Sequence, residues 1–242
     1  MCDTCGCGGN HEHEAEFSKI EALNARFALH NRRHFQAMGA FAVNLMAAPG
    51  SGKTTLLEHT LARLKEQGRM AAVLVGDLAT DLDALRLKKF GYPVQSIATG
   101  MACHLNAEMV ARALHALPKR QFDFLFIENV GNLVCPAGLD LGEDAKAVLW
   151  STPEGEDKPC KYPQMFLCAN LVAISKSELA PFLGFDLHAA QEKLRRLGVS
   201  GPILSLSAKT GEDMEAWFSW LEEALAAKGR TALLASEGHG AS

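Results

Sequence analysis

A glycine-rich segment at residues 47–54 has the composition and spacing of a phosphate-binding loop. It reads A-x-x-x-x-G-K-T and follows an apolar run that predicts a buried strand. Glycine lets the backbone approach a ligand closely, and the N–H groups that begin the next helix face its phosphates. Lys53 then supplies positive charge to the β and γ oxygens, and Thr54 can ligate Mg²⁺ through its hydroxyl, so we take Lys53 as catalytic. The residues assigned to nucleotide binding are Gly50, Ser51, Gly52, Lys53, Thr54 and Thr55.

Acidic residues follow two further predicted strands. Residues 70–75 and 122–127 are continuous apolar runs of the kind buried in a parallel sheet, and they lead to Asp77 and Glu128. Parallel sheets bind ligands at the carboxyl ends of their strands, so we expect Asp77 on a strand next to the first one, holding Mg²⁺ or orienting the attacking water. Glu128, with Gly131 three residues later, is typical of a γ-phosphate sensor. In such a sensor the acid reaches Mg²⁺ through water and the glycine N–H meets the phosphate. Asp77 and Glu128 therefore join the predicted catalytic residues.

Three thiols near the N-terminus predict a metal site. Cys2, Cys5 and Cys7 form C-x-x-C-G-C within residues 1–14, a segment too short and too polar to pack a core. Thiolates are soft ligands, and the fourth ligand is either the terminal amine or a histidine. A square-planar set of thiolates and amine suits Ni²⁺ or copper, whereas a tetrahedral set with histidine suits Zn²⁺. The alternative is a disordered tail with incidental cysteines.

A second group of metal-ligating residues is spread over two loops. Cys103 and His104 precede a helix predicted at 106–117, and Cys135 lies four residues after Gly131. Adjacent residues chelate one ion poorly, so the pair needs a partner elsewhere in the chain or across a dimer axis. Each of the two alone would more often be structural. If Cys135 joins them, the loop that senses the nucleotide also carries a metal ligand, and metal affinity will depend on the nucleotide.

The elements that position these residues alternate between helix and strand, which predicts an α/β fold. We expect a mostly parallel P-loop sheet flanked by helices, with a flexible N-terminal metal-binding tail. The expected units are the tail at 1–14, an amphipathic helix at 15–38, the P-loop domain at 39–228 and a frayed tail at 229–242. The closing helix is expected at 213–227. Asp81 and Asp83 are expected to cap a helix at 84–90. His30 and His34 share one face of the N-terminal helix, which we interpret as a solvated face rather than a metal pair.

Composition excludes several classes of partner. The chain has 242 residues, 48% of them hydrophobic and 21% charged, with a formal charge of −4 and a pI near 6.1. Its scattered basic residues give no footprint for nucleic acid. The sequence has no apolar run of about 18 residues and no signal-peptide pattern, so we expect a cytoplasmic protein without membrane insertion. In that reducing compartment seven cysteines indicate metal or redox chemistry rather than disulfides.

These pieces together resemble one family, the hydrogenase nickel-incorporation GTPases called HypB proteins. The resemblance covers nearly the whole chain, and the run ending in Cys135-Pro136 is its most specific part. The matching segments are 2–7, 48–55, 103–104, 126–136, 154–159 and 207–209.

The resemblance implies sites, a reaction and partners. Cys2, Cys5 and Cys7 match a tight nickel site, while Cys103, His104 and Cys135 match a labile Ni²⁺ or Zn²⁺ site at the interface of a GTP-dependent homodimer. The family hydrolyses GTP slowly with Mg²⁺. It delivers nickel to the large-subunit precursor of NiFe hydrogenase with a small partner metallochaperone, HypA. The main alternative is a nickel or zinc storage protein whose nucleotide controls only dimerisation, and a phosphoryl-transferring kinase ranks last.

The guanine-reading motif departs from the family pattern N-K-x-D. This chain has Ser175, Lys176, Ser177 and Glu178 instead. In the family the acid accepts hydrogen bonds from guanine, the asparagine braces the base and the lysine packs over the ring. We therefore expect a weaker guanine preference, since one lost base-reading bond costs about 1–3 kcal/mol. The predicted base-binding residues are Lys176, Glu178, Ser207, Ala208 and Lys209.

Overall fold

A single parallel sheet forms the centre of the molecule. The computed structural model describes residues 9–77, 81–100 and 102–237, with side chains from residue 19 to residue 230 outside those gaps. In that part of the chain the sheet has seven strands in the order β3-β2-β4-β1-β5-β6-β7, and every neighbouring pair is parallel. The strands are β1 (Phe41–Ala47), β2 (Ala71–Asp77), β3 (Val94–Ala98), β4 (Phe124–Glu128), β5 (Ala145–Ser151), β6 (Leu171–Ser175) and β7 (Ile203–Leu206). The predicted α/β fold with a parallel sheet is confirmed.

The strand order corrects the expected position of Asp77. We expected the strand that ends at Asp77 to pair with the first strand, but β4 lies between them. Glu128 at the end of β4 pairs with Leu45 of β1 on one side and with Val75 of β2 on the other. All five residues of β4 are buried, which suits a central strand. At the carboxyl ends of the strands, Glu128 therefore lies between β1 and β2. Asp77, at the end of β2, lies one strand further from β1.

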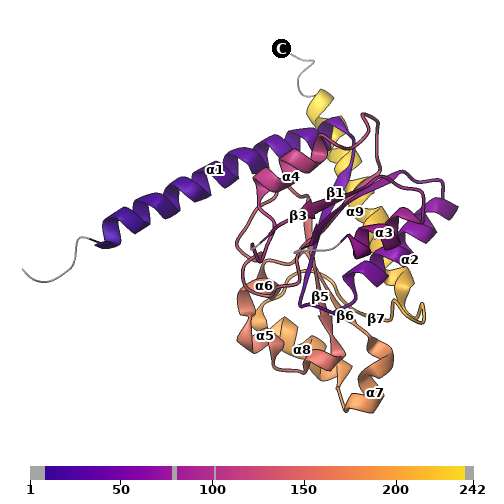
Figure 1. Ribbon diagram of the computed structural model, residues 1–242. Coiled ribbons are helices and arrows are strands. Elements are labelled where there is room, and N and C mark those ends of the chain that lie inside the picture. The colour runs from indigo at the N-terminus through magenta and orange to yellow at the C-terminus, as the bar shows by residue number, and fades with distance from the viewer. Residues whose placement is uncertain (1–8, 78–80, 101, 238–242) are drawn as a thin grey trace, which may run out of the picture.

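Helices cover both faces of the sheet (Figure 1). Successive residues of a strand point to opposite faces. In β1, Val43 and Leu45 pack in the core under α2 and α9, whereas Ala42 belongs to the core under α4 and Met46 to the core under α6 and α8. The helices are α1 (Gly9–Ala37), α2 (Lys53–Glu66), α3 (Leu82–Lys88), α4 (Ala107–Leu114), α5 (Lys158–Lys161), α6 (Pro163–Leu167), α7 (Ala180–Leu183), α8 (Leu187–Leu197) and α9 (Met214–Glu237), with short 3₁₀ turns at Thr152–Glu154 and Ser177–Leu179.

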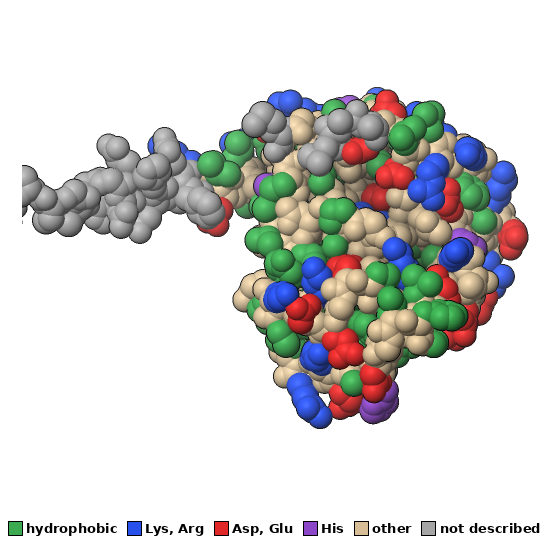
Figure 2. Space-filling view, turned by 60° about the horizontal axis from the view of Figure 1, so that its bottom comes forward, with side chains coloured by type: hydrophobic (Ala, Val, Ile, Leu, Met, Phe, Trp, Pro, Cys, Tyr) green, Lys and Arg blue, Asp and Glu red, His purple; other side chains and the backbone are tan. Residues whose placement is uncertain are grey.

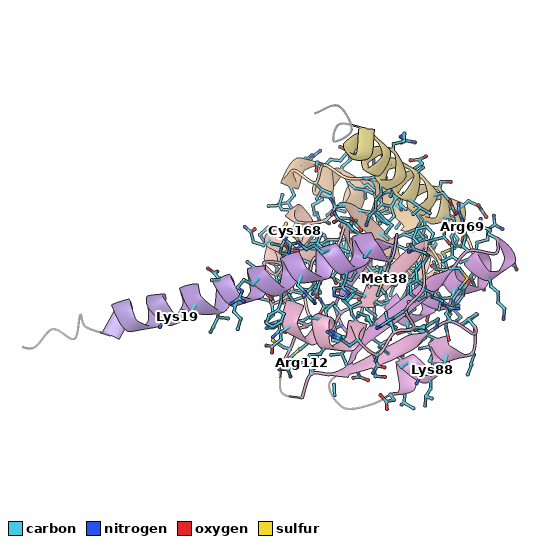
Figure 3. All side chains as sticks on the ribbon, turned by 90° about the horizontal axis from the view of Figure 1, so that it is seen from above. Lys19, Met38, Arg69, Lys88, Arg112 and Cys168 are labelled. Atoms are coloured by element: carbon cyan, nitrogen blue, oxygen red, sulfur yellow. The ribbon has the colours of Figure 1, made fainter. Side chains whose placement is uncertain are left out.

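The two terminal helices are longer than expected. α1 begins at Gly9 rather than at residue 15, because its polar start has no apolar periodicity to reveal it. Its first turns project from the domain: Lys19 lies on the projecting part of the helix and Met38 over the body (Figure 3). α9 does not stop at residue 227 but continues through Gly229, since one glycine costs a helix only about 1 kcal/mol.

Surface charge and helix apolarity can both be described for this part of the chain. On the face drawn in Figure 2, acidic and basic side chains are intermingled rather than gathered in one basic area. Among residues 9–77, 81–100 and 102–237, no helix combines the length and apolarity needed to cross a membrane.

Candidate nucleotide and metal sites

The phosphate-binding loop connects β1 to α2. Gly50 and Gly52 have φ of 74° and 95°, a region that favours glycine, so both positions need this residue type. Ser51 closes the turn by donating to the carbonyl of Ala48 from its backbone N–H at 3.3 Å and from its hydroxyl at 2.8 Å. The start of α2 therefore faces a cavity of about 500 Å³. Its walls include the predicted residues Gly50, Gly52, Lys53, Thr54, Thr55, Asp77, Glu128, Gly131 and Lys176.

Lys53, Thr54 and Glu128 form the buried end of this cavity. The Thr54 hydroxyl donates to Glu128 Oε1 at 2.7 Å, and Glu128 is only 4% exposed. Burial raises the pKa of Glu128 to about 7 although Lys53 opposes the shift. Burial also lowers the pKa of Lys53, against the attraction of Glu128, so for both groups desolvation outweighs pairing. Glu128 Oε2 is buried and has no hydrogen-bond partner among the described residues. A carboxylate and a hydroxyl placed in this way can hold Mg²⁺.

The outer wall contains residues that the sequence did not reveal as site residues. Asp83 and Arg86 of α3 line the same cavity as Asp77. Asp83 does not cap its helix: it lies in the first turn and pairs with Arg86 at 3.2 Å. Arg86 also contacts Glu58 of α2 at 2.6 Å. Asp81 is the residue before the helix, but its side chain makes no capping hydrogen bond. The spacing of Asp83 and Arg86 was the only available signal, and it does not indicate a pocket.

Gly131 packs directly against the phosphate-binding loop. A Cβ at this position would lie 2.8 Å from the backbone of Pro49, so only glycine fits. The next residue, Asn132, donates its backbone N–H to the carbonyl of Ala47 at 2.8 Å. The segment after β4 therefore lies against the loop that is expected to hold the phosphates.

A second cavity, of about 290 Å³, adjoins the first and shares Gly52, Thr55 and Lys176 with it. Its wall also includes the predicted residues Ser51, Glu178, Ala208 and Lys209. Glu178 Oε2 is buried without a hydrogen-bond partner among the described residues. Ser207 is fully buried and does not line the wall, but its hydroxyl accepts from the N–H of Thr210 at 3.1 Å and so supports the turn.

Hydrogen bonds tie this second cavity to the phosphate-binding loop. Ser175 donates its hydroxyl to the carbonyl of Ser51 at 2.7 Å. Thr152 donates to the carbonyl of Lys176, which has a positive φ of 58°. Glu154, which the sequence did not single out as a site residue, shares the single Ser51 hydroxyl proton with the carbonyl of Ala48, and its Oε1 lies 2.7 Å from that hydroxyl. The polar group of Ser175 thus braces the loop although it is shorter than asparagine.

Cys103, His104 and Cys135 come together within one chain. Their ligand atoms all lie within 4.8 Å of one another, and the two Sγ atoms are 3.0 Å apart. Hydrogen bonding to Cys103 raises the pKa of the Cys135 thiol, whereas burial lowers the pKa of His104. As expected, the pair precedes a helix: Asn106 caps α4 by accepting from the N–H of Met109. The cluster can hold a metal ion.

Asn132 links the two halves of this cluster. Its Oδ1 accepts from the backbone N–H groups of Val134 and Cys135 at 2.7 and 3.3 Å, and its Nδ2 donates to the carbonyl of Cys103 at 3.3 Å. Sequence reasoning missed this residue, although it lies between Gly131 and Cys135 in the conspicuous run 126–136. The expected nickel ligands Cys2, Cys5 and Cys7 lie outside the described residues.

Comparison with known proteins identifies the family. Residues 41–205 match the CobW/HypB/UreG nucleotide-binding domain. The chain is 47% identical to the hydrogenase maturation factor HypB of Escherichia coli K12 over 209 residues, which are 86% of this chain and 71% of that protein. It is 46% identical over 203 residues to the HypB of Azotobacter chroococcum mcd 1, covering 84% of this chain and 66% of that protein. It thus spans about two thirds of the length of these relatives.

Solved structures give the same result. The crystal structure of Helicobacter pylori HypB in complex with nickel has a TM-score of 0.79 and 40% identity, covering 84% of this chain and 95% of that one. The HypB of Archaeoglobus fulgidus has a TM-score of 0.78 and 37% identity, covering 84% and 99%. The chain therefore belongs to the CobW/HypB/UreG family and, within it, to the HypB hydrogenase maturation factors.

Proposed function

We propose that this protein is a GTP-hydrolysing nickel metallochaperone that delivers Ni²⁺ to the large-subunit precursor of NiFe hydrogenase under control of its nucleotide. One observation carries the proposal. The segment 128–135 begins at the buried carboxyl group of Glu128 in the phosphate cavity, the cavity of about 500 Å³ beside the phosphate-binding loop. It then packs Gly131 against that loop and ends at Cys135, a thiol of the Cys103–His104–Cys135 cluster. Its relatives bear the name hydrogenase maturation factor, and one was solved in complex with nickel.

The phosphate cavity supplies groups suited to GTP hydrolysis. Lys53 would hold the β and γ phosphates, and Gly131 would donate its N–H to the γ-phosphate. Mg²⁺ would be held by Thr54, with Glu128 and Asp77 beside it, and when bound it neutralises charge that develops on the phosphates. The unpartnered Oε2 of Glu128 supports this assignment, since a buried carboxylate normally has a partner.

The second cavity supports a preference for guanine. A buried acceptor oxygen of Glu178 in its wall fits the N1–H and exocyclic amine of that base. Adenine presents no N1–H donor, so it would leave this oxygen unpaired. Lys176 lines both cavities and would pack along the ring between them.

Two sites would carry the cargo. Cys2, Cys5 and Cys7 would hold Ni²⁺ tightly at the N-terminus. Cys103, His104 and Cys135 supply only three donors, which suits a transient Ni²⁺ or Zn²⁺ site that a second copy completes in a GTP-dependent homodimer. A HypA-type metallochaperone would be the exchange partner, in the cytoplasm, where thiols stay reduced.

Coupling between nucleotide and metal is the testable core of the proposal. Replacing Cys2, Cys5 and Cys7 with serine removes the competing N-terminal site from the full chain. Ni²⁺ is then titrated with GDP and with a non-hydrolysable GTP analogue. We expect the two affinities to differ by about 5- to 150-fold, because the segment that meets the γ-phosphate carries Cys135.

A single-turnover GTPase assay and a transfer assay to metal-free hydrogenase precursor complete the test. Equal Ni²⁺ affinities with both nucleotides would contradict the coupling. Tight nickel binding without GTP-dependent transfer would favour the storage protein. A Cys160→Ser variant is the matched control, because Cys160 is an exposed cysteine of α5 outside the Cys103–His104–Cys135 cluster.

A further inference from the structure

Three histidines gather on the surface where α1 and α4 run side by side (Figure 1). His30 and His34 lie one turn apart on α1, and His115 directly follows α4. The centroids of the His30 and His34 rings are 4.5 Å apart, and the His115 ring lies 6.4 Å from the first and 6.0 Å from the second. Spacing along the chain does not associate His115 with the pair, which we expected to lie on a solvated face.

These distances are close to those of a three-imidazole metal site. A metal–nitrogen bond of about 2.0–2.1 Å places each ring centroid about 3 Å from the ion, so three ligating rings have centroids about 4.5–5.5 Å apart. The pair on α1 already has that separation. His115 would have to approach by roughly 1 Å, which a rotation of an exposed side chain can supply.

The hydrogen bond of His115 orients it as a ligand. Its Nδ1 lies 2.8 Å from the carbonyl oxygen of Ala111, which can only accept, so Nδ1 carries the proton. The lone pair is therefore on Nε2, the atom left to bind a cation. Metal-binding histidines usually have such a carbonyl partner on the second nitrogen.

The two helices are fixed relative to each other before any ion binds. Asn31, which is fully buried next to His30, donates to the carbonyls of Ala107 and Leu141 at 2.8 and 2.9 Å. Asn24 accepts from the N–H of Ala107 at 2.9 Å. These bonds hold the start of α4 against α1, so the site needs side-chain rotation rather than helix movement.

The electrostatics of the cluster favour a neutral imidazole at His34. Burial, His30 and His115 all lower the pKa of His34. The carboxylate on α4, Glu108, lies about two helical turns before His115 and is paired with Arg112 at 2.6 Å. Neutral imidazole nitrogens without a carboxylate select borderline divalent ions such as Ni²⁺, Zn²⁺ and Cu²⁺.

We propose that His30, His34 and His115 form a further metal site that binds one Ni²⁺ or Zn²⁺ ion at the α1–α4 surface. It is separate from the cysteine cluster, which precedes the opposite end of α4, about 12 Å away along an eight-residue helix. Binding here does not depend on GTP hydrolysis or on delivery to a client. The proposal can therefore fail while the proposed function stands, and the reverse is also true.

The test uses the full, untagged chain with Cys2, Cys5, Cys7, Cys103, His104 and Cys135 replaced, which removes the other two metal sites. Ni²⁺ is titrated into this background and into the same background carrying His115→Gln or His34→Gln. We expect one ion per chain and an affinity at least about tenfold lower in either variant, since even the loss of a ligand's hydrogen-bond partner costs about 10- to 100-fold. His188→Gln, an exposed histidine on α8, is the matched control and should leave the affinity unchanged.

A second measurement locates the ion directly. Substoichiometric Ni²⁺, which is paramagnetic, should broaden the ring proton resonances of His30, His34 and His115 before those of His59 and His188. Circular dichroism melts check that each variant is folded. Equal Ni²⁺ affinity in the His115→Gln and His188→Gln proteins, or first broadening of other histidines, would overturn the proposal.

Discussion

The phosphate end of the nucleotide cavity and the cysteine cluster differ in how far water reaches them. Lys53, Thr54 and Glu128 are 8%, 8% and 4% exposed, whereas Cys103 is exposed and Cys135 is half-buried. Charged and polar groups interact strongly when they are buried away from water. Substituting one of them leaves its partner unpaired, which is costly. Solvent-exposed thiols are accessible to metal ions and to other reactants. The same segment, 128–135, thus connects a buried polar site to a cysteine cluster that is open to solvent.

The largest expected effect comes from the buried end. Lys53→Ala removes the charge at the β and γ phosphates, so we expect single-turnover GTP hydrolysis to fall by at least about 100-fold. Nickel binding by the N-terminal cysteines should stay unchanged, because that site has its own ligands. Lys65→Ala, an exposed lysine on the same helix, is the control. Loss of the N-terminal nickel in the Lys53 variant would contradict the separation of the two sites.

Glu128→Gln tests the cost of the buried carboxyl group in metal-free protein. Its pKa of about 7 in the fold exceeds its ordinary value of 4.5, so between these pH values the folded chain keeps a proton that the unfolded chain has lost. Stability therefore falls as the pH rises through this window, and above pH 7 the full cost of about 3 kcal/mol applies. Glutamine carries no charge and can still accept from Thr54.

Urea unfolding at pH 5 and pH 8 without Mg²⁺ measures this effect. The variant should be more stable than the parent at pH 8, by up to about 3 kcal/mol, and its stability should depend less on pH. Glu66→Gln, an exposed position at the end of α2, should keep the parental pH dependence. The same pH slope in the Glu128 variant and the parent would refute the assignment of the proton to this residue.

A smaller effect is expected at the exposed cluster. Cys135→Ser replaces a soft ligand with a weak one, so Co²⁺ or Ni²⁺ affinity there should fall at least about tenfold and the thiolate absorption band should weaken. Cys160→Ser should change neither quantity. The measurement needs protein in which Cys2, Cys5 and Cys7 have been replaced, because their site would otherwise dominate the absorption. Unchanged affinity would remove Cys135 from the site.

What the sequence could predict depended on whether the interaction was local. The phosphate-binding loop lies within residues 47–54, so its chemistry could be recognised from spacing alone. Arg86 of the outer wall pairs with Glu58 only because α2 and α3 pack together, and no spacing encodes that. The position of β4 between β1 and β2 could not be predicted for the same reason, because strand order depends on contacts between segments that are far apart in the sequence.

Distance along the chain also explains what was missed in the metal sites. Cys135 could be associated with Cys103 and His104 because the family resemblance joins them. His115 had no such guide, and it meets His30 only through the packing of α1 on α4. Helix ends were misplaced where polar or alanine-rich sequence continues past the last periodic apolar residue, as in α1 and α9.

The smallest effect concerns base recognition in the second cavity, which adjoins the one that contains Lys53. A Ser175→Asn, Glu178→Asp double variant restores the family's motif, and we expect it to raise the ratio of GTP to ATP affinity by about fivefold, equivalent to one hydrogen bond of about 1 kcal/mol. Ser175 already braces the phosphate-binding loop through Ser51, so Glu178→Asp alone should account for most of the gain. Competition binding with GTP, ATP and inosine triphosphate measures it: inosine lacks the exocyclic amine, so the variant's advantage should shrink with that nucleotide. Equal GTP to ATP ratios in the parent and the double variant would show that Glu178 reads guanine as well as aspartate does.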